Sequence, residues 1–381
     1  MNADTAILMA GVPSSNKAVF HRVRFAPHDP VSWIQLSDGR RIMIVRDVEL
    51  PRAKRSDRAD VAHAYEDFAP ADGLSGDRAI RAAQATAECL VRKNVKRVIA
   101  DRTLLLIYVD ELRRRGIDVE CDLDLGIIER RQKDADEVAA LREAQRVTEL
   151  AIRHACEFIA TSVAGDDGAL HRDGRPVTSE RVRDEIDGAL RQHGCSGEGH
   201  IVAGGPDAAD CHFGGRGQLY TGGPIIVDVF PRHLATGYHG DCTRTVVHGD
   251  IPLNVAKMHE AVVEAKAASL TATKAGVTGE AVHQAAVDVL HRHGYATGFA
   301  SNGKPGGYMP HGTGHGIGLD LKEPPLLDMG GPELLVGDAI TVEPALYDTT
   351  IGGIRLEDLV IVTENGYENL NTLPESLDWR P

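Results

Sequence analysis

Four acidic residues stand inside or beside short apolar segments in the second half of this 381-residue chain: Asp228, Asp241, Glu343 and Glu357. A carboxylate in an apolar strand is costly unless it is paired, protonated or bound to a metal ion. If the four converge, divalent cations are the favourable counter-charge, and two adjacent ions bridged by carboxylates can share a hydroxide nucleophile. The residue types therefore indicate metal-assisted hydrolysis.

A histidine-containing segment, His311-Gly-Thr-Gly-His315, offers a further ligand. The H-x-x-x-H spacing is typical of helical zinc proteases, but Gly312 and Gly314 disfavour a helix and no glutamate follows the first histidine. A phosphate-binding loop is also disfavoured, because neither a helix nor a Lys-Ser/Thr ending follows. We therefore expect a loop or strand that presents one ligand.

An internal repeat positions these residues. The segment 177–194 recurs at 277–294, each time with a threonine suited to a helix N-cap and a glycine suited to the position after the helix. A long amphipathic helix is predicted over 134–161, before the first copy, and a second long helix is predicted over 255–274, before the other copy. Each copy is followed by a buried strand with one acid and a hairpin with another. Two pseudosymmetric halves are expected to meet at a shared site.

The residues before this repeat indicate a separate, smaller α/β domain over 1–131, with the larger domain over 132–381. Strands are predicted over 31–36, 41–45, 97–100 and 118–122, and helices over 77–94 and 104–115. The first two strands are joined by Ser37-Asp-Gly-Arg40, a hairpin signal. This region concentrates no chemistry.

Five motifs follow one another in order: Val227-Asp228, Gly237-Tyr-x-x-Asp241-x-Thr-Arg-Thr245, His311-Gly-x-Gly-His315-Gly-Ile-Gly-Leu-Asp320, Thr341-Val-Glu343-Pro344 and Gly353-x-Arg355-x-Glu357-Asp358. Their combination resembles the "pita-bread" metallopeptidases, which include Xaa-Pro aminopeptidases, Xaa-Pro dipeptidases (prolidases) and methionine aminopeptidases. The preceding region resembles, more weakly, the creatinase-type N-terminal domain of the proline-specific members. The resemblance implies an α/β (α+β) fold whose catalytic domain has pseudo-twofold halves.

The resemblance also implies a site. The implied ligands of two divalent metal ions are Asp228, Asp241, His315, Glu343 and Glu357. Carboxylate-rich ligation suits Mn²⁺, with Co²⁺ or Zn²⁺ also compatible. Glu343 is implied as the general base for a metal-bridging hydroxide. His212 and His311 are implied as substrate contacts, and Arg355 is implied to help bind the far end of the substrate. The implied reaction is hydrolysis of the peptide bond before proline in a small peptide, by an aminopeptidase or a dipeptidase.

One position departs from the family pattern. Lys322 stands where active members carry a histidine that hydrogen-bonds the substrate carbonyl or the tetrahedral intermediate. Lysine donates hydrogen bonds but cannot accept them. We expect Lys322 to face the site as a catalytic donor to the developing oxyanion. The other reading is that Lys322 turns to solvent, where Glu323 could pair with it.

Two other functions are compatible with these residues. One is a hydrolase of the same fold that cleaves a non-peptide C–N bond, creatinase-like or ectoine-hydrolase-like, which the substitution at Lys322 favours. The other is a catalytically silent binding protein, which the retention of all five ligand positions disfavours.

Charge and composition restrict the partners. Asp plus Glu is 56 against 42 for Lys plus Arg, and the net charge of −14 disfavours nucleic acid and anionic membranes. The six cysteines include no C-x-x-C pair, which favours a reducing compartment. The apolar run at 6–12 is too short for a membrane span and has no basic lead. We expect a cytoplasmic protein, and the resemblance implies a homodimer.

Overall fold

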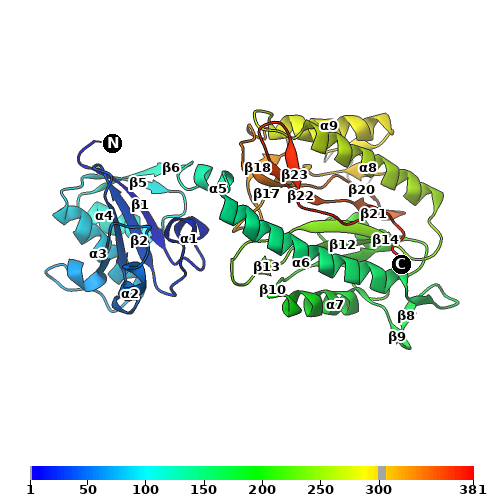
Figure 1. The fold of residues 1–381 in the computed structure, drawn as a ribbon, viewed down its shortest axis with the longest axis horizontal. Helices are drawn as coiled ribbons and strands as arrows, with labels where there is room; N and C mark the ends of the chain where they lie inside the picture. The colour runs from blue at the N-terminus through cyan, green and yellow to red at the C-terminus, as the bar shows by residue number, and fades with distance from the viewer. Residues whose placement is uncertain (1, 299–305) are drawn as a thin grey trace. The chain divides into compact units, whose positions relative to one another are not determined.

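The computed structural model describes residues 2–298 and 306–381. The chain divides into two compact units, Met1–Arg130 and Arg131–Pro381, and the short helix α5 (Ile128–Arg131) spans the boundary (Figure 1). None of the helices in the described part of the chain combines the length and apolarity needed to cross a membrane.

The N-terminal unit is a six-stranded mixed sheet with helices on both faces. Its strands are β1 (Thr5–Gly11), β2 (Val31–Leu36), β3 (Arg41–Val45), β4 (Val61–Ala64), β5 (Arg97–Asp101) and β6 (Asp118–Asp122), and its helices are α1 (Lys17–Val23), α2 (Leu50–Ala53), α3 (Arg78–Arg92) and α4 (Leu106–Arg114). The strand order is β4-β3-β2-β1-β5-β6. The predicted hairpin is confirmed as β2 and β3, which pair antiparallel.

Strand β1 lies inside this sheet and was not predicted. Leu8 belongs to the apolar core formed with α3 and α4, whereas its neighbour Met9 belongs to the core formed with α1. Because the strand is buried on both faces, its sequence is continuously apolar and carries no alternation to mark it as a strand.

The C-terminal unit holds the pseudosymmetric halves. Its helices are α6 (Ala135–Ala160), α7 (Ser179–Gln192), α8 (Leu253–Ala272) and α9 (Gly279–Arg292). Its strands are β7 (Val163–Ala164), β8 (Leu170–Arg172), β9 (Arg175–Pro176), β10 (Cys195–Ser196), β11 (Ile201–Gly204), β12 (Pro224–Val229), β13 (Arg232–His233), β14 (Cys242–Val247), β15 (Ala296–Thr297), β16 (Tyr308–Met309), β17 (Gly314–Gly316), β18 (Glu323–Leu327), β19 (Ala339–Val342), β20 (Ala345–Asp348), β21 (Gly352–Arg355), β22 (Asp358–Val362) and β23 (Tyr367–Asn369).

The strands β12, β14, β20 and β21 of this unit lie between the helix pair α6 and α7 and the helix pair α8 and α9 (Figure 1). In the first half β12 pairs antiparallel with β11 and β14, and in the second β19 pairs antiparallel with β17 and β22. The pairs β12–β14 and β19–β22 are buried along their whole length. Each half therefore supplies one buried pair of strands to the interior of the unit.

The capping residues of the repeat are confirmed. The side chains of Thr178 and Thr278 accept hydrogen bonds from the first-turn backbone N–H groups of α7 and α9. Gly194 and Gly294 follow the two helices with φ of 72° and 83°, the left-handed conformation that glycine adopts readily. The same local chemistry thus starts and ends the corresponding helix in each half.

Candidate metal centre and active-site cavity

The four acids lie at corresponding points of the two halves. Asp228 is on β12 and Asp241 directly precedes β14, while Glu343 directly follows β19 and Glu357 directly precedes β22. Asp228, Asp241 and Glu357 are buried, with exposed fractions of 7%, 4% and 2%. The strands therefore bring the acids together in the interior of the unit, where each charge needs compensation.

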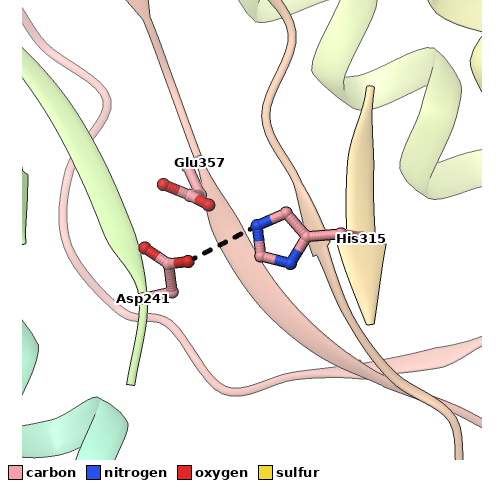
Figure 2. A group of neighbouring side chains, drawn as sticks. All are labelled: Asp241, His315 and Glu357. Atoms are coloured by element: carbon pink, nitrogen blue, oxygen red, sulfur yellow. Dashed lines mark ion pairs between the residues drawn. The ribbon is translucent and has the colours of Figure 1, made fainter. Parts of the chain in front are cut away.

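His315 completes this group. One ligand atom from each of Asp241, His315 and Glu357 lies within 4.8 Å of the other two (Figure 2). The Nε2 atom of His315 lies 3.7 Å from Oδ2 of Asp241 and 3.5 Å from Oε1 of Glu343. His315 is on β17, so the predicted strand or loop that presents a ligand is present at the site.

The glycines around His315 permit close backbone packing. A Cβ atom on Gly314 would lie 2.0 Å from the carbonyl oxygen of Thr341, and one on Gly316 would lie 2.4 Å from that of Pro324. Only glycine lets β17 fit between its neighbouring strands here. The glycine-rich pattern therefore serves strand packing rather than phosphate binding.

The hydrogen bond of His315 determines which of its ring nitrogens faces the carboxylates without a proton. Its Nδ1 atom lies 3.0 Å from the carbonyl oxygen of Gly316, which can only accept, so Nδ1 carries the proton. In the neutral ring Nε2 then directs a lone pair toward the oxygens of Asp241 and Glu343. Such an arrangement is repulsive unless a cation lies between them, and the donor set fits a divalent metal ion.

The pKa values of two of the acids reflect the same repulsion between buried negative charges. Burial, and then the charges of neighbouring carboxylates, raise the pKa of Asp241 and of Glu357 well above the usual range. Burial also acts to raise the pKa of Glu343, but His315 and His311 in their protonated forms, together with the Arg355 guanidinium, outweigh it and the pKa falls. Oδ1 of Asp228 is buried and has no hydrogen-bond partner among the described residues. These carboxylates are therefore arranged for more positive charge than the Arg355 guanidinium alone supplies.

Two side chains to which the sequence assigned no role hold the acids in place. Gln145 on α6 accepts from the backbone N–H of Asp241 at 2.8 Å and donates to its carbonyl oxygen at 2.8 Å. The hydroxyl of Thr243 donates to Oε2 of Glu357 at 2.7 Å. Asp241 is thus positioned through its backbone, which leaves its carboxylate free, and Glu357 through one of its two oxygens.

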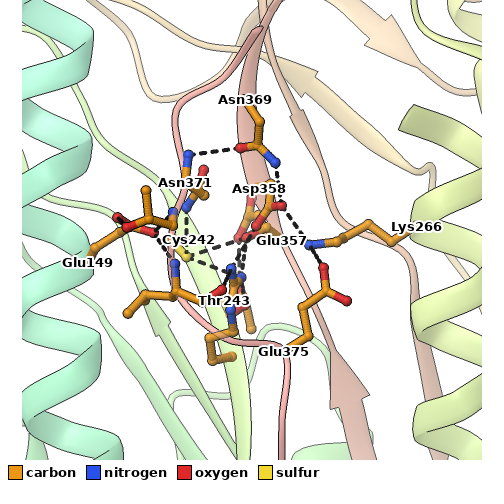
Figure 3. A network of polar contacts seen from close by, with 12 residues as sticks. Glu149, Cys242, Thr243, Lys266, Glu357, Asp358, Asn369, Asn371 and Glu375 are labelled. Carbon is orange, nitrogen blue, oxygen red and sulfur yellow. Dashed lines mark hydrogen bonds and ion pairs between the residues drawn. The ribbon is translucent and has the colours of Figure 1, made fainter. Parts of the chain in front are cut away.

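A buried ionic network lies behind Glu357 (Figure 3). Arg244 donates to the carbonyl oxygen of Glu357 at 2.7 Å and to Oδ1 of Asp358 at 2.8 Å. Lys266 donates to Oδ2 of Asp358 at 2.6 Å and also pairs with Glu375 at 2.6 Å. Burial opposes ionisation of Asp358, but Arg244 and Lys266 overcome it and lower its pKa to about 2. The network fixes the start of β22 beside the ligand cluster.

Arg355 is occupied by the protein. Its Nη2 donates to Oδ2 of Asp228 at 2.5 Å, and its Nη1 donates to the hydroxyl of Tyr347 at 2.7 Å. Further bonds reach the carbonyl oxygen of Cys211 at 3.2 Å and the hydroxyl of Thr243 at 3.3 Å. Arg355 is 3% exposed, so its guanidinium positions Asp228 and has little free surface.

The ring of His311 is held on both sides. Its Nδ1 lies 2.7 Å from the carbonyl oxygen of Gly312 and its Nε2 lies 2.9 Å from the hydroxyl of Tyr347. Nδ1 therefore donates, and Nε2 accepts from the Tyr347 O–H. Burial lowers the pKa of His311, so the ring is neutral at neutral pH.

All nine predicted site residues line one cavity of about 350 Å³. The ligand acids and His315 form part of its wall, together with His311 and Arg355. His212 and Lys322 also line it, and both side chains are exposed. The apolar part of the wall includes Ile201, Phe230 and Leu321. The cavity is large enough for a small peptide and joins the candidate metal centre to solvent.

The sequence profile of metallopeptidase family M24 matches residues 139–364. The chain belongs to metallopeptidase family M24. This M24 chain is 38% identical over 187 residues to a probable dipeptidase PepE of Mycobacterium tuberculosis, a match that covers 47% of each chain. It therefore spans about half the length of that curated relative.

Solved structures extend the likeness to nearly the whole M24 chain. An Xaa-Pro dipeptidase from Bacillus anthracis superposes with a TM-score of 0.79 at 24% identity, over 98% of this chain and 94% of that one. An X-Pro aminopeptidase from Thermotoga maritima gives a TM-score of 0.77 at 23% identity, over 98% and 96%. The predicted α/β pita-bread fold is confirmed.

Proposed function

We propose that this chain is a dinuclear metal-dependent exopeptidase that hydrolyses the peptide bond before proline. The observation that carries the proposal is the convergence of Asp241, His315 and Glu357 in the cavity, with a histidine lone pair facing carboxylates. Membership of family M24 supports a peptidase, and the relatives named as Xaa-Pro peptidases support the preference for proline.

Five side chains would hold the ions: Asp228, Asp241, His315, Glu343 and Glu357. Two divalent ions bound there supply Lewis-acid polarisation of the scissile carbonyl and lower the pKa of an attacking water. The mostly oxygen donor set suits Mn²⁺, and Co²⁺ and Zn²⁺ are the other ions to test.

Glu343 is the proposed general base. Its lowered pKa keeps it ionised at neutral pH, so that it can accept a proton from the attacking water. As the C–N bond breaks, the same carboxyl group can return that proton to the leaving proline nitrogen. The exposed fraction of the Glu343 side chain is 18%, which leaves it open to the cavity.

The remaining residues bind and orient. His311 is neutral and fixed by Tyr347, so it offers the substrate a rigid ring rather than a charge. His212 lies at the exposed part of the cavity, where it can contact the substrate. Arg355 supports catalysis by holding Asp228.

We further propose a cytoplasmic homodimer. All six cysteines are free thiols, which suits a reducing compartment. The dimer rests on the resemblance to proline-specific peptidases and is tested by light scattering of the purified chain.

The test is hydrolysis of Ala-Pro, Ala-Pro-Ala and Ala-Ala by metal-stripped protein after addition of Mn²⁺, Co²⁺ or Zn²⁺. We expect metal-dependent cleavage of at least one proline substrate and much slower cleavage of Ala-Ala. Equal cleavage of Ala-Pro and Ala-Ala would contradict the proline preference. If creatine or an ectoine-type ring were cleaved and none of the peptides were, the result would instead support a hydrolase of a non-peptide C–N bond, the alternative that the substitution at Lys322 favours.

A further inference from the structure

Lys322 lines the same cavity as the candidate metal centre, and its side chain is exposed. The neighbouring acid that could have drawn it outward is engaged elsewhere. Glu323 is buried and its Oε1 accepts from Nζ of Lys133 at 2.5 Å, in a pair whose side chains are 5% and 2% exposed. The alternative in which Glu323 pairs with Lys322 at the surface is therefore wrong.

The other full positive charge in the cavity wall is committed. Arg355 donates to Asp228, Tyr347, Thr243 and Cys211, as described above. Among the cavity-lining residues that the structure describes, Lys322 is the one lysine or arginine without an ion pair or hydrogen bond. Its ammonium group is available to a ligand.

The charges in the cavity wall favour an anionic ligand for this ammonium. Arg355 is paired with Asp228, whereas Lys322 forms no ion pair with any described residue. The charge of Lys322 is therefore available to an anionic group in a partly desolvated cavity, where ionic contacts are stronger than in water.

The exposure of Lys322 suits binding of an anionic substrate group better than stabilisation of an oxyanion at the scissile carbonyl. Stabilisation of an oxyanion is strongest from a donor fixed in a dry site, whereas Lys322 is exposed on a flexible four-carbon stem. In an Xaa-Pro dipeptide the free carboxylate is attached to the proline Cα, next to the scissile nitrogen. In a longer peptide that position carries a neutral amide.

We propose that Lys322 binds the free α-carboxylate of the substrate's proline and makes this chain selective for dipeptides. The inference rests on the proposed function, because it assigns the substrate class of the same site. Lys322 is then a specificity-determining residue, and its contact with the substrate is made in the ground state as well as during the reaction.

The test compares an acid with its isosteric amide. We measure kcat/KM for Ala-Pro and Ala-Pro-amide, and calorimetric binding of the product L-proline and of L-prolinamide, for the wild type and Lys322→Met. A charge-assisted hydrogen bond contributes about 1.5 kcal/mol at its lower end, so the acid should be favoured on the order of tenfold. In Lys322→Met both acid-to-amide ratios should fall to about one.

Three further variants separate charge from structure. Lys322→Arg should retain a preference for the acid, and Lys322→Glu should reverse it. Lys257→Met, which removes an exposed lysine of α8 outside the cavity, should keep the wild-type ratio. A wild-type ratio near one, or a ratio that survives Lys322→Met, overturns the inference while the peptidase function stands. Absence of hydrolysis of every proline substrate would refute the proposed function, and the proline-binding ratio would still decide the role of Lys322.

Discussion

Replacement of Asp241 by Asn should stabilise the metal-free chain at neutral pH. The Asp241 side chain is buried beside three other carboxylates, and burial followed by their charges raises its pKa well above the usual range. Its backbone is held by Gln145, so the amide substitution leaves that anchor in place. Because Asn is nearly isosteric, the principal change is the removal of a buried, repelled charge.

The sign follows from proton linkage. A carboxyl group whose pKa is higher in the folded than in the unfolded state binds more protons when folded, so the free energy of unfolding falls as pH rises between the two values. The loss is about 1.4 kcal/mol for each pH unit that separates them, and about twice that where Asp241 and Glu357 titrate together. At pH 4, near the unfolded pKa, the wild type and Asp241→Asn should have similar stability.

Metal should invert the order of stability. With Mn²⁺ at 100 times its dissociation constant, a single site adds about 2.7 kcal/mol to the free energy of unfolding of the wild type. The variant should gain less, because one ligand is lost.

The assay is urea unfolding from pH 4 to 8, with chelator or with excess Mn²⁺. Asp250→Asn, at an exposed position outside the cavity, is the control for the loss of one negative charge. If metal-free Asp241→Asn is less stable than the wild type at pH 8, or if both show the same pH dependence, the account of the buried acids is wrong.

Three further substitutions test the surroundings of the site. Thr243→Val removes the hydroxyl that holds Glu357 and should weaken metal affinity by about tenfold, as measured by competition with a chelator. Lys133→Met removes the ammonium group that pairs with the buried carboxylate of Glu323 and should cost about 3 to 5 kcal/mol in urea unfolding, part of which Glu323→Gln in the same chain should restore. Tyr347→Phe removes the hydroxyl that joins the neutral histidine to the arginine and should lower kcat about fivefold with metal content unchanged; an unchanged kcat would show that this link is not needed.

The sequence predicted the acids of the site because Asp228 breaks an otherwise apolar strand and the other three lie directly beside buried strands. Asp228 lies in a run that is buried at every position, and such a charge has few structural explanations. The helix ends were predictable for a similar reason, since the capping chemistry of Thr178 and Thr278 is local.

The supporting residues could not be predicted because their partners are distant in sequence. Gln145 meets Asp241 from 96 positions away, and Lys133 meets Glu323 from 190. No local pattern marks such pairs. The pairing of Glu323 with Lys322 was wrongly considered for the same reason. The two residues are adjacent in the sequence, whereas Lys133, the actual partner of Glu323, is distant from it in the sequence.

The most direct test of the central claim is anomalous diffraction at the manganese absorption edge from crystals of the chain loaded with Mn²⁺. We predict two peaks in the cavity whose protein ligands are Asp228, Asp241, His315, Glu343 and Glu357. The same preparation should hydrolyse Ala-Pro. Peaks elsewhere, or no peak beside these five residues in a preparation that hydrolyses Ala-Pro, would contradict the dinuclear metal centre.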